Sequence, residues 1–477
     1  MTLHHSGYLA YGSSEIETAN IGPRSKVATS PDFLAQAKWE FEDSTEKFIE
    51  TLEKIVYPYQ WSEYNLLILP SSFPYGGTFS SAFVRVLLVS RSRFCLSWVL
   101  EIASPNPYPL ARRHLRTKTG MENPVYTYVT PTTVSGDRQN VDVVAHELSH
   151  SYSGNLVTAA TWMDFWLNEG WTTYLERRLQ AALHGEPHRD FSSIIGWKAL
   201  TDSVDGFGKD DEFTKLIPEL TGKDPDDAFS SVPYEKGYIF LSYLEGVVGR
   251  EKWNTYIPHY FTTFARKSLS SDEFKANLLA FFQTDAKASE ALRAVDWQAW
   301  FYSPGLPPKP DFDTSLADVC YYLVSKWQDA DFKPSKSDID GWSANQVVVF
   351  LDAIFDLKPP LSKDRVQLLG DTYGFITSKN VEVSSRYLKV GLQSRLESVY
   401  KPTTELLGQV GRMKFVRPLY ATCHNASIVH ILTRKCRYRL LNEADRKLAL
   451  ETFEQNKNYY HPICRDMVQK DLYGPKV

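Results

Sequence analysis

One ten-residue segment, Val141–His150 (VDVVAHELSH), constrains this chain more than any other. Its apolar positions recur at helical spacing, and we expect a helix with Asp137 as its N-cap. His146 and His150 lie four positions apart, so both imidazoles face the same side of the helix and can bind one metal ion. Glu147 is adjacent to the first of them and can reach a water bound to that ion. The segment therefore predicts a zinc-type metal centre built on a helix.

A catalytic zinc site needs a third protein ligand and an open position for water. The segment Thr161–Arg178 (TWMDFWLNEGWTTYLERR) shows a second helical pattern, and within it Glu169 lies 19 residues after His150. We expect His146, His150 and Glu169 to hold one zinc ion per chain, with Glu147 as the general base. The alternative is a surface helix whose histidines and glutamate are merely solvated, and the apolar face of the motif helix argues against it.

Composition narrows the class of protein. The 477 residues are 43% hydrophobic and 23% charged, which excludes a disordered or low-complexity chain. Lys and Arg number 53 against 57 Asp and Glu, so no basic field suggests a nucleic-acid partner. No stretch has the pattern of a membrane span or a secretory leader. The small number of cysteines favours a reducing compartment. We therefore expect a soluble, cytoplasmic protein. We also expect a monomer, with the nucleus as a second location. The five cysteines are Cys95, Cys320, Cys423, Cys436 and Cys464.

The order of patterns along the chain predicts an α+β protein with two main domains. We expect a lead-in over residues 1–25, a first domain over 26–302, a linker over 303–312 and an α-helical domain over 313–477. Four prolines in the eight residues Ser303–Pro310 mark the linker, because such density breaks helices. The expected strand is Tyr64–Leu69, and the helical patterns are Ala37–Ile55, Thr314–Trp327, Ser343–Phe355, Lys363–Tyr373 and Ser384–Tyr400.

Further motifs extend the zinc signature. They are WLNEG (Trp166–Gly170), VPYEKG (Val232–Gly237), YSPGLPP (Tyr302–Pro308) and GRMKFVRPL (Gly411–Leu419). With HELSH, they make the sequence resemble the leukotriene A-4 hydrolase family from about Ile21 to the C-terminus. These are bifunctional zinc aminopeptidases and epoxide hydrolases among the gluzincin metallopeptidases. The resemblance implies a thermolysin-like catalytic domain followed by an all-α, helical-repeat-like domain. It also implies that residues 1–25 are the remnant of an N-terminal β domain.

The resemblance implies roles for residues outside the zinc motif. Tyr234 would donate a hydrogen bond to the developing oxyanion. Gly120, Met121 and Glu122 would bind the N-terminal end of the substrate, with Glu122 paired with its free α-ammonium. Without the motifs, Tyr234 would be an ordinary packed aromatic and Glu122 an exposed acid.

Three more residues match family positions that bind or direct the rest of the substrate. Arg412 and Lys414 match the cationic pair that binds a substrate carboxylate, although alone they would be a solvated basic turn. Asp226 matches the aspartate that directs water during epoxide hydrolysis. Phe229 is a departure, because it stands where the vertebrate enzyme has a tyrosine.

The function expected from the resemblance is removal of N-terminal residues from short peptides, with epoxide hydrolase activity on epoxy fatty acids of leukotriene type. The alternative is a truncated, catalytically impaired homolog that acts at most as a binding protein. Zinc content and release of a chromogenic amine from an aminoacyl arylamide would separate the two.

Two stretches do not fit the family pattern. Thr78–Thr119 carries seven Lys or Arg against one acid, and Ala421–Tyr438 carries three against none. Removing residues 78–120 joins Gly77 to Met121 and restores the family sequence PYGGMENP. We interpret both stretches as insertions, either lineage-specific surface loops or the product of a translated intron or a gene-model error. The cysteines and histidines of the second stretch match no standard zinc spacing.

Overall fold

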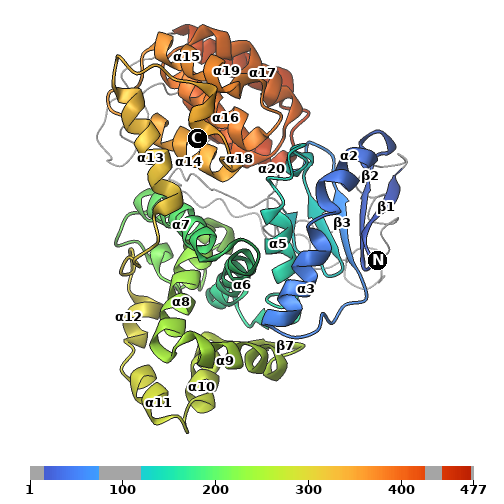
Figure 1. Ribbon diagram of the computed structural model, residues 1–477, viewed down its shortest axis with the longest axis vertical. Coiled ribbons are helices and arrows are strands. Elements are labelled where there is room, and N and C mark those ends of the chain that lie inside the picture. The colour runs from blue at the N-terminus through green and yellow to red at the C-terminus, as the bar shows by residue number, and fades with distance from the viewer. Residues whose placement is uncertain (1–15, 75–119, 425–442, 474–477) are drawn as a thin grey trace.

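The computed structural model describes residues 16–74, 120–424 and 443–473 (Figure 1). Most of both predicted insertions, residues 78–119 and 425–438, lies outside these ranges. Within the described residues, a domain with a β-sheet is followed by a domain of helices alone, which confirms the α+β class.

The main sheet has five strands in the order β1-β2-β3-β5-β4. The outer pairs, β1 with β2 and β5 with β4, are antiparallel, whereas the pairs β2–β3 and β3–β5 are parallel. Strand β1 lies inside the predicted lead-in, so residues 17–22 belong to the sheet rather than to a loose segment. The strands are β1 (Glu17–Gly22), β2 (Ser25–Thr29), β3 (Tyr64–Ile68), β4 (Gly120–Met121) and β5 (Tyr126–Val129).

One face of this sheet packs on helices α2 (Pro31–Phe41) and α3 (Thr45–Ile55). Leu66 points into the main core on this side, and Leu67 points into a smaller cluster on the other, as the two-residue period of a strand requires. The predicted strand Tyr64–Leu69 is thus confirmed as β3.

The rest of the first domain is mainly helical, with α6 running through its middle (Figure 1). Trp166 and Trp171 of α6 and Trp253 of α9 are wholly buried in this part of the domain. The remaining helices and strands are α5 (Asp142–Ser149), β6 (Val157–Ala159), α6 (Trp166–His184), α7 (Glu186–Phe207), α8 (Gly237–Val248), α9 (Arg250–Thr263), β7 (Lys267–Leu269), α10 (Ser271–Phe281), α11 (Ala286–Arg293) and α12 (Trp297–Tyr302).

Helices α6 and α8 approach each other at a pair of glycines. A Cβ atom added to Gly237 would lie 2.9 Å from the Cα of Gly170, and one added to Gly170 would lie 2.9 Å from the Cα of Gly237. Real Cβ atoms do not come so close to backbone. Glycine at both positions therefore sets the distance between the two helices.

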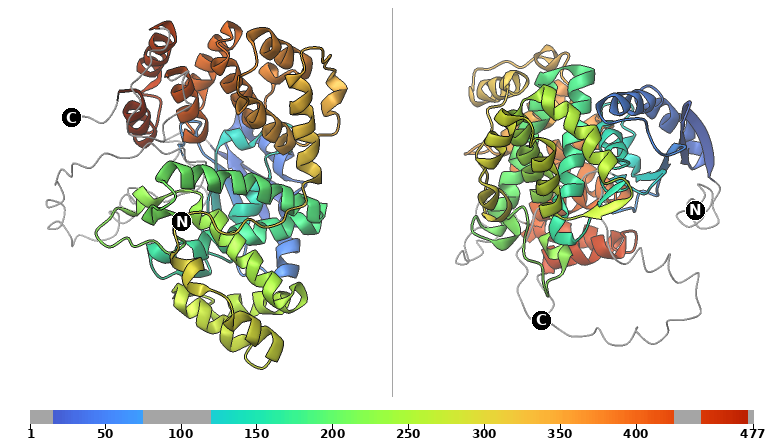
Figure 2. Two further views of the ribbon diagram at one scale, coloured as in Figure 1. Left: turned by 90° about the vertical axis from the view of Figure 1, so that its left-hand side faces the viewer. Right: turned by 90° about the horizontal axis from the view of Figure 1, so that it is seen from below.

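The second domain lies at one end of the molecule and contains helices without strands among its described residues (Figures 1 and 2). It has its own buried core, separate from that of the first domain. Its helices are α13 (Ser315–Gln328), α14 (Ala344–Phe355), α15 (Lys363–Tyr373), α16 (Val381–Gln393), α17 (Tyr400–Gln409), α18 (Met413–His424), α19 (Glu443–Asn456) and α20 (Pro462–Tyr473).

Two predicted helices are wrong in extent. The pattern over Ala37–Ile55 is divided between α2 and α3 by a turn at residues 42–44. The pattern over Ser384–Tyr400 is divided because α16 ends at Gln393 and Arg395 adopts a positive φ of 55°. An α-helix cannot continue through that left-handed conformation.

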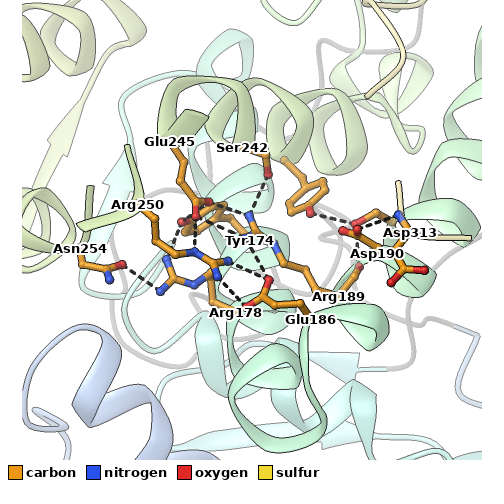
Figure 3. Close-up of polar contacts among 12 residues, drawn as sticks. Tyr174, Arg178, Glu186, Arg189, Asp190, Ser242, Glu245, Arg250, Asn254 and Asp313 are labelled. Atoms are coloured by element: carbon orange, nitrogen blue, oxygen red, sulfur yellow. Dashed lines mark hydrogen bonds and ion pairs between the residues drawn. The ribbon is translucent and has the colours of Figure 1, made fainter. Parts of the chain in front are cut away.

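Hydrogen bonds and ion pairs at Glu245 join α6 to the three helices around it (Figure 3). Arg189 of α7 binds Glu245 of α8 at 2.7 Å, and the Tyr174 hydroxyl of α6 donates to the same carboxylate at 2.9 Å. Arg250 of α9 also donates to Glu245 at 2.8 Å. The network orients the helix that contributes most to the candidate site.

Polar contacts fix the second domain against the first. Asn380, the N-cap of α16, exchanges hydrogen bonds with Asn140 at 3.2 and 3.3 Å. The Gly411 amide donates to the Ser71 carbonyl at 2.8 Å, and a Cβ at Gly411 would overlap the backbone of Ser72. Of the helices described, none has the length and apolar character to cross a membrane.

We expect Gly237→Ala to lower the free energy of unfolding by about 1–3 kcal/mol, because the added methyl pushes α8 away from α6. Gly246→Ala in the same helix is the matched control, because a Cβ there meets nothing within 4 Å. It should raise stability by up to about 1 kcal/mol through helix propensity. Urea unfolding of both variants measures the difference, and equal effects would contradict the packing argument.

Candidate active site

The metal motif lies on the short helix α5 (Asp142–Ser149), with His150 as its C-cap. The rings of His146 and His150 lie 4.8 Å apart between centroids and are nearly perpendicular. The predicted N-cap is wrong, because Val141 caps the helix without a side-chain hydrogen bond. Asp137 instead accepts from the Gln139 amide at 3.0 Å in the preceding turn.

Glu169, on the first turn of α6, faces both histidines. Its Oε2 lies 3.6 Å from His146 Nε2 and 3.4 Å from His150 Nε2. All three side chains are 2% exposed, and their ligand atoms lie within 4.8 Å of one another. The structure thus brings together the three predicted zinc ligands.

The Nδ1 atom of each imidazole lies within hydrogen-bond distance of a neighbouring group. His146 Nδ1 lies 2.8 Å from Glu176 Oε2, and His150 Nδ1 lies 2.9 Å from the Ser153 carbonyl and 3.0 Å from Thr172 Oγ1. These contacts leave both Nε2 atoms directed at the metal position, as ligating histidines require. Glu176 was not predicted from the sequence, although it follows Glu169 by seven residues, two turns along the same face of α6.

The three donors fit a zinc ion. Glu169 Oε2 is buried and accepts no hydrogen bond of ordinary geometry from a described residue. Burial raises the pKa of Glu169, but His150 and His146 outweigh burial and hold it at about 2. Burial lowers the pKa of His150, but Glu122 and Glu169 outweigh burial and raise it to about 10. Excess negative charge of this kind favours a bound cation, and imidazole nitrogen and carboxylate oxygen are zinc ligands.

Two carboxylates border the metal position. Glu147 is 1% exposed, and its carboxylate lies with the Glu122 carboxylate and the His150 imidazole in a second group whose ligand atoms are within 4.8 Å of one another. Glu122 directly follows strand β4, and Asn155 Nδ2 donates to its carbonyl at 2.8 Å. Gly120 and Met121 form β4 and pair with β5. The predicted base and the predicted ammonium-binding acid therefore lie together.

Tyr234 also lies at the metal position and belongs to a π-helical turn, η5 (Val232–Lys236). Its ring is stacked on that of His146 with centroids 6.1 Å apart. Burial, with Glu169 and Glu122 in addition, raises its pKa well above the usual value. The phenol therefore stays protonated and is a hydrogen-bond donor. The sequence did not predict the π-helical turn.

An apolar pocket lies beside Tyr234. Phe229, which lines the pocket, makes an edge-on contact with the Tyr234 ring at 6.1 Å. Asp226 belongs to the adjacent 3₁₀ turn η4 (Pro225–Ala228). Other lining residues are Trp162, Phe165, Phe213, Leu216 and Leu220.

Arg412 and Lys414 lie at the seam between the two domains, around an acid that sequence analysis missed. Lys414 Nζ lies 2.5 Å and Arg412 Nη1 3.5 Å from Glu382 Oε1. Arg412 also donates to Thr132 Oγ1 of the first domain at 3.4 Å. Burial lowers the pKa of Lys414 to about 7 and that of Arg412 to about 10, and Glu382 opposes the shift in both.

Two known protein families match the two domains of the chain. The peptidase family M1 domain matches residues 107–300, and the leukotriene A4 hydrolase C-terminal domain matches residues 342–436 and 432–472. A leukotriene A-4 hydrolase homolog of Botryotinia fuckeliana is 57% identical over 97% of this chain and 62% of its own length. Leucine aminopeptidase 2 of Sclerotinia sclerotiorum is also 57% identical, over 97% and 66%. The chain thus spans a little under two thirds of these curated relatives.

A solved structure extends the likeness to three dimensions. Yeast LTA4 hydrolase in complex with bestatin superimposes with a TM-score of 0.80 at 38% identity. The match covers 96% of this chain and 67% of the yeast chain. Both described domains and their relative placement are therefore shared with that protein.

We expect Glu176→Gln to weaken zinc binding about 10–100-fold, because His146 loses the carboxylate that orients it. Glu245→Gln is the matched control, since it removes a buried carboxylate that contacts α6 but no predicted ligand. Chelator competition on both zinc-loaded variants gives the affinities. Equal affinities would show that Glu176 does not support the metal centre.

Proposed function

Because this chain belongs to the leukotriene A-4 hydrolase family of M1 peptidases, we propose that it is a zinc-dependent aminopeptidase acting on short peptides. The observation that carries the proposal is the convergence of His146, His150 and Glu169 in one buried cluster beside Glu147. A solvated surface helix, the alternative for the motif, would leave these side chains exposed.

The residues of the site suit peptide hydrolysis. When bound, zinc supplies Lewis-acid polarisation of the scissile carbonyl and lowers the pKa of a water molecule. Glu147 accepts a proton from the attacking water and delivers it to the leaving amine. Tyr234 donates a hydrogen bond to the oxygen on which negative charge develops. Glu122 binds the free α-ammonium and thereby restricts cleavage to N-terminal residues.

The cationic residues at the domain seam suit the other end of a short peptide. Arg412, Lys414 and Arg386 surround Glu382, and Asp352 binds Arg386 at 3.2 Å. The two arginines balance the two carboxylates, so the protonated fraction of Lys414 leaves this group with a net positive charge. We propose that the C-terminal carboxylate of the substrate is attracted here.

We also propose a second activity, hydrolysis of epoxides in epoxy fatty acids. The apolar pocket beside Tyr234 supports this proposal, because it offers a place for an aliphatic chain. Arg412 and Lys414 would bind the fatty-acid carboxylate, and Asp226 would direct the water. Phe229 cannot donate the hydrogen bond that a tyrosine could make there.

We further propose a reducing compartment, the cytoplasm with the nucleus as a second location, as the place of action. Cys320 and Cys464 are buried free cysteines. Such cysteines are typical of proteins in reducing compartments.

We expect Glu147→Gln to lower kcat for an aminoacyl arylamide about 10²–10⁴-fold while zinc stays bound. The amide cannot accept the proton from water, whereas all three metal ligands remain. Glu251→Gln on the exposed first turn of α9 is the control and should leave kcat unchanged. Activity and zinc content are measured on the same samples. Full activity of Glu147→Gln would refute its role as the base.

We expect Arg412→Ala to raise KM at least about tenfold for tripeptides with a free carboxylate, because a charge-assisted hydrogen bond is lost. The same peptides with C-terminal amides are the control and should show little change. Equal losses for acids and amides would mean that Arg412 serves only the contact between the domains.

A further inference from the structure

Tyr234 is followed by two charged residues that are both buried. Glu235 is 6% exposed and Lys236 is 2% exposed, and with Tyr234 they occupy consecutive positions of η5. π-Helical turns are rare and occur frequently at functional sites. What these two residues contact therefore bears on where the Tyr234 phenol lies.

Lys236 donates three hydrogen bonds to backbone carbonyls. They reach Thr214 at 2.9 Å, Ser303 at 2.9 Å and Gly305 at 3.0 Å. In the part of the chain that the structure describes, these carbonyls and no carboxylate bind its ammonium group. Burial lowers the pKa of Lys236 to about 8, so the group keeps its charge at pH 7. Burying a cation costs free energy unless its hydrogen-bond donors are satisfied. The ammonium group of Lys236 is therefore held where the three carbonyls can accept its hydrogen bonds.

The three carbonyls belong to two segments that are distant in sequence. Thr214 ends the turn η3 (Glu212–Thr214), and its neighbours Phe213 and Lys215 line the apolar pocket. Ser303 and Gly305 begin the linker between the domains, and the Gly305 amide donates to Thr214 Oγ1 at 2.8 Å. Lys236 thus joins one wall of the pocket, the linker and the turn that carries Tyr234.

The far end of the linker is also attached to the first domain. The Asp313 amide donates to Asp190 Oδ2 of α7 at 2.9 Å, as Figure 3 shows. Because both ends are held, the linker gives Lys236 a fixed support. The Pro-rich linker is therefore held against the first domain at both of its ends.

Glu235 makes a second attachment on the other side of the turn. Its Oε2 lies 2.8 Å from Arg177 Nη1 on α6, and both side chains are buried. Arg177 directly follows Glu176, which holds the predicted ligand His146. A methyl group at Gly196 of α7 would overlap both members of the pair, so α7 covers the pair closely.

We propose that Lys236, with Glu235 as its counterpart, is a positioning residue that sets the place of the Tyr234 phenol relative to the metal centre. Lys236 anchors the π-helical turn to the linker and to the pocket wall, and Glu235 anchors it to α6. This inference rests on the proposed peptidase function. It goes further in assigning the orientation of the oxyanion donor to two residues that do not touch substrate.

A double-mutant cycle with Tyr234→Phe tests the proposal. Lys236→Met has similar length but no donors, and in the zinc-loaded full chain it should lower kcat for an aminoacyl arylamide about tenfold. In the Tyr234→Phe background the same change should alter kcat less than about twofold, because the donor that it misplaces is already gone. Lys236→Arg, which keeps charge and donors, should recover part of the loss.

Arg189→Met is the matched control, because it breaks a buried ion pair between α7 and α8 that does not involve the Tyr234 turn (Figure 3). It should lower the melting temperature yet change kcat by the same factor in both backgrounds. The proposal is overturned if Lys236→Met also acts equally in both backgrounds, or lowers the melting temperature without lowering kcat. If Lys236→Met does not fold, the cycle with Glu235→Gln decides by the same criterion.

Hydrogen exchange separates failure of this proposal from failure of the proposed function. An inactive wild-type chain would refute the peptidase. In that chain, Lys236→Met should still speed amide exchange in residues 230–238 and 303–306, whereas Arg189→Met should not. Unchanged exchange in both segments would overturn the anchoring by Lys236 whether or not the chain is active.

Discussion

The close approach of α5 to the first turn of α6 is the constraint on which the rest of the site depends. It brings Glu169 Oε2 within 3.6 Å of His146 Nε2 and 3.4 Å of His150 Nε2. Helix α6 also supplies Glu176 and Thr172, which contact the other nitrogens of the same rings. One helix therefore provides one predicted ligand and supports the other two. Gly170, directly after Glu169, sets how near α8 and the Tyr234 turn can come.

Two groups of charged residues with opposite net sign lie at the candidate site and at the seam between the domains. Four carboxylates, those of Glu122, Glu147, Glu169 and Glu176, surround the two histidines of the metal motif. At the seam between the domains, cations outnumber carboxylates around Glu382. A peptide with a free ammonium at one end and a carboxylate at the other complements this arrangement, and that complementarity supports the proposed choice of substrate.

Sequence reasoning succeeded where the signal was local. The spacing of His146, Glu147 and His150 places them on one helix face whatever the rest of the chain does. It failed for Glu382, whose partners Arg412 and Lys414 are distant in sequence and meet it only through the packing of α16 on α18. Lys236 was not predicted either, because its partners are also distant in sequence. In addition, a lysine in a sequence normally predicts an exposed side chain. The division of the predicted helix Ser384–Tyr400 depends on the backbone of Arg395, which no propensity indicates.

The central claim is that α5 and α6 together hold a zinc ion through two imidazoles and one carboxylate. X-ray absorption at the zinc edge of the purified chain tests this most directly. We expect one zinc per chain with two nitrogen ligands at about 2.0–2.1 Å and a carboxylate oxygen at about 2.0–2.2 Å. A spectrum with sulfur ligands at about 2.3 Å, or a chain that retains no zinc, would contradict it.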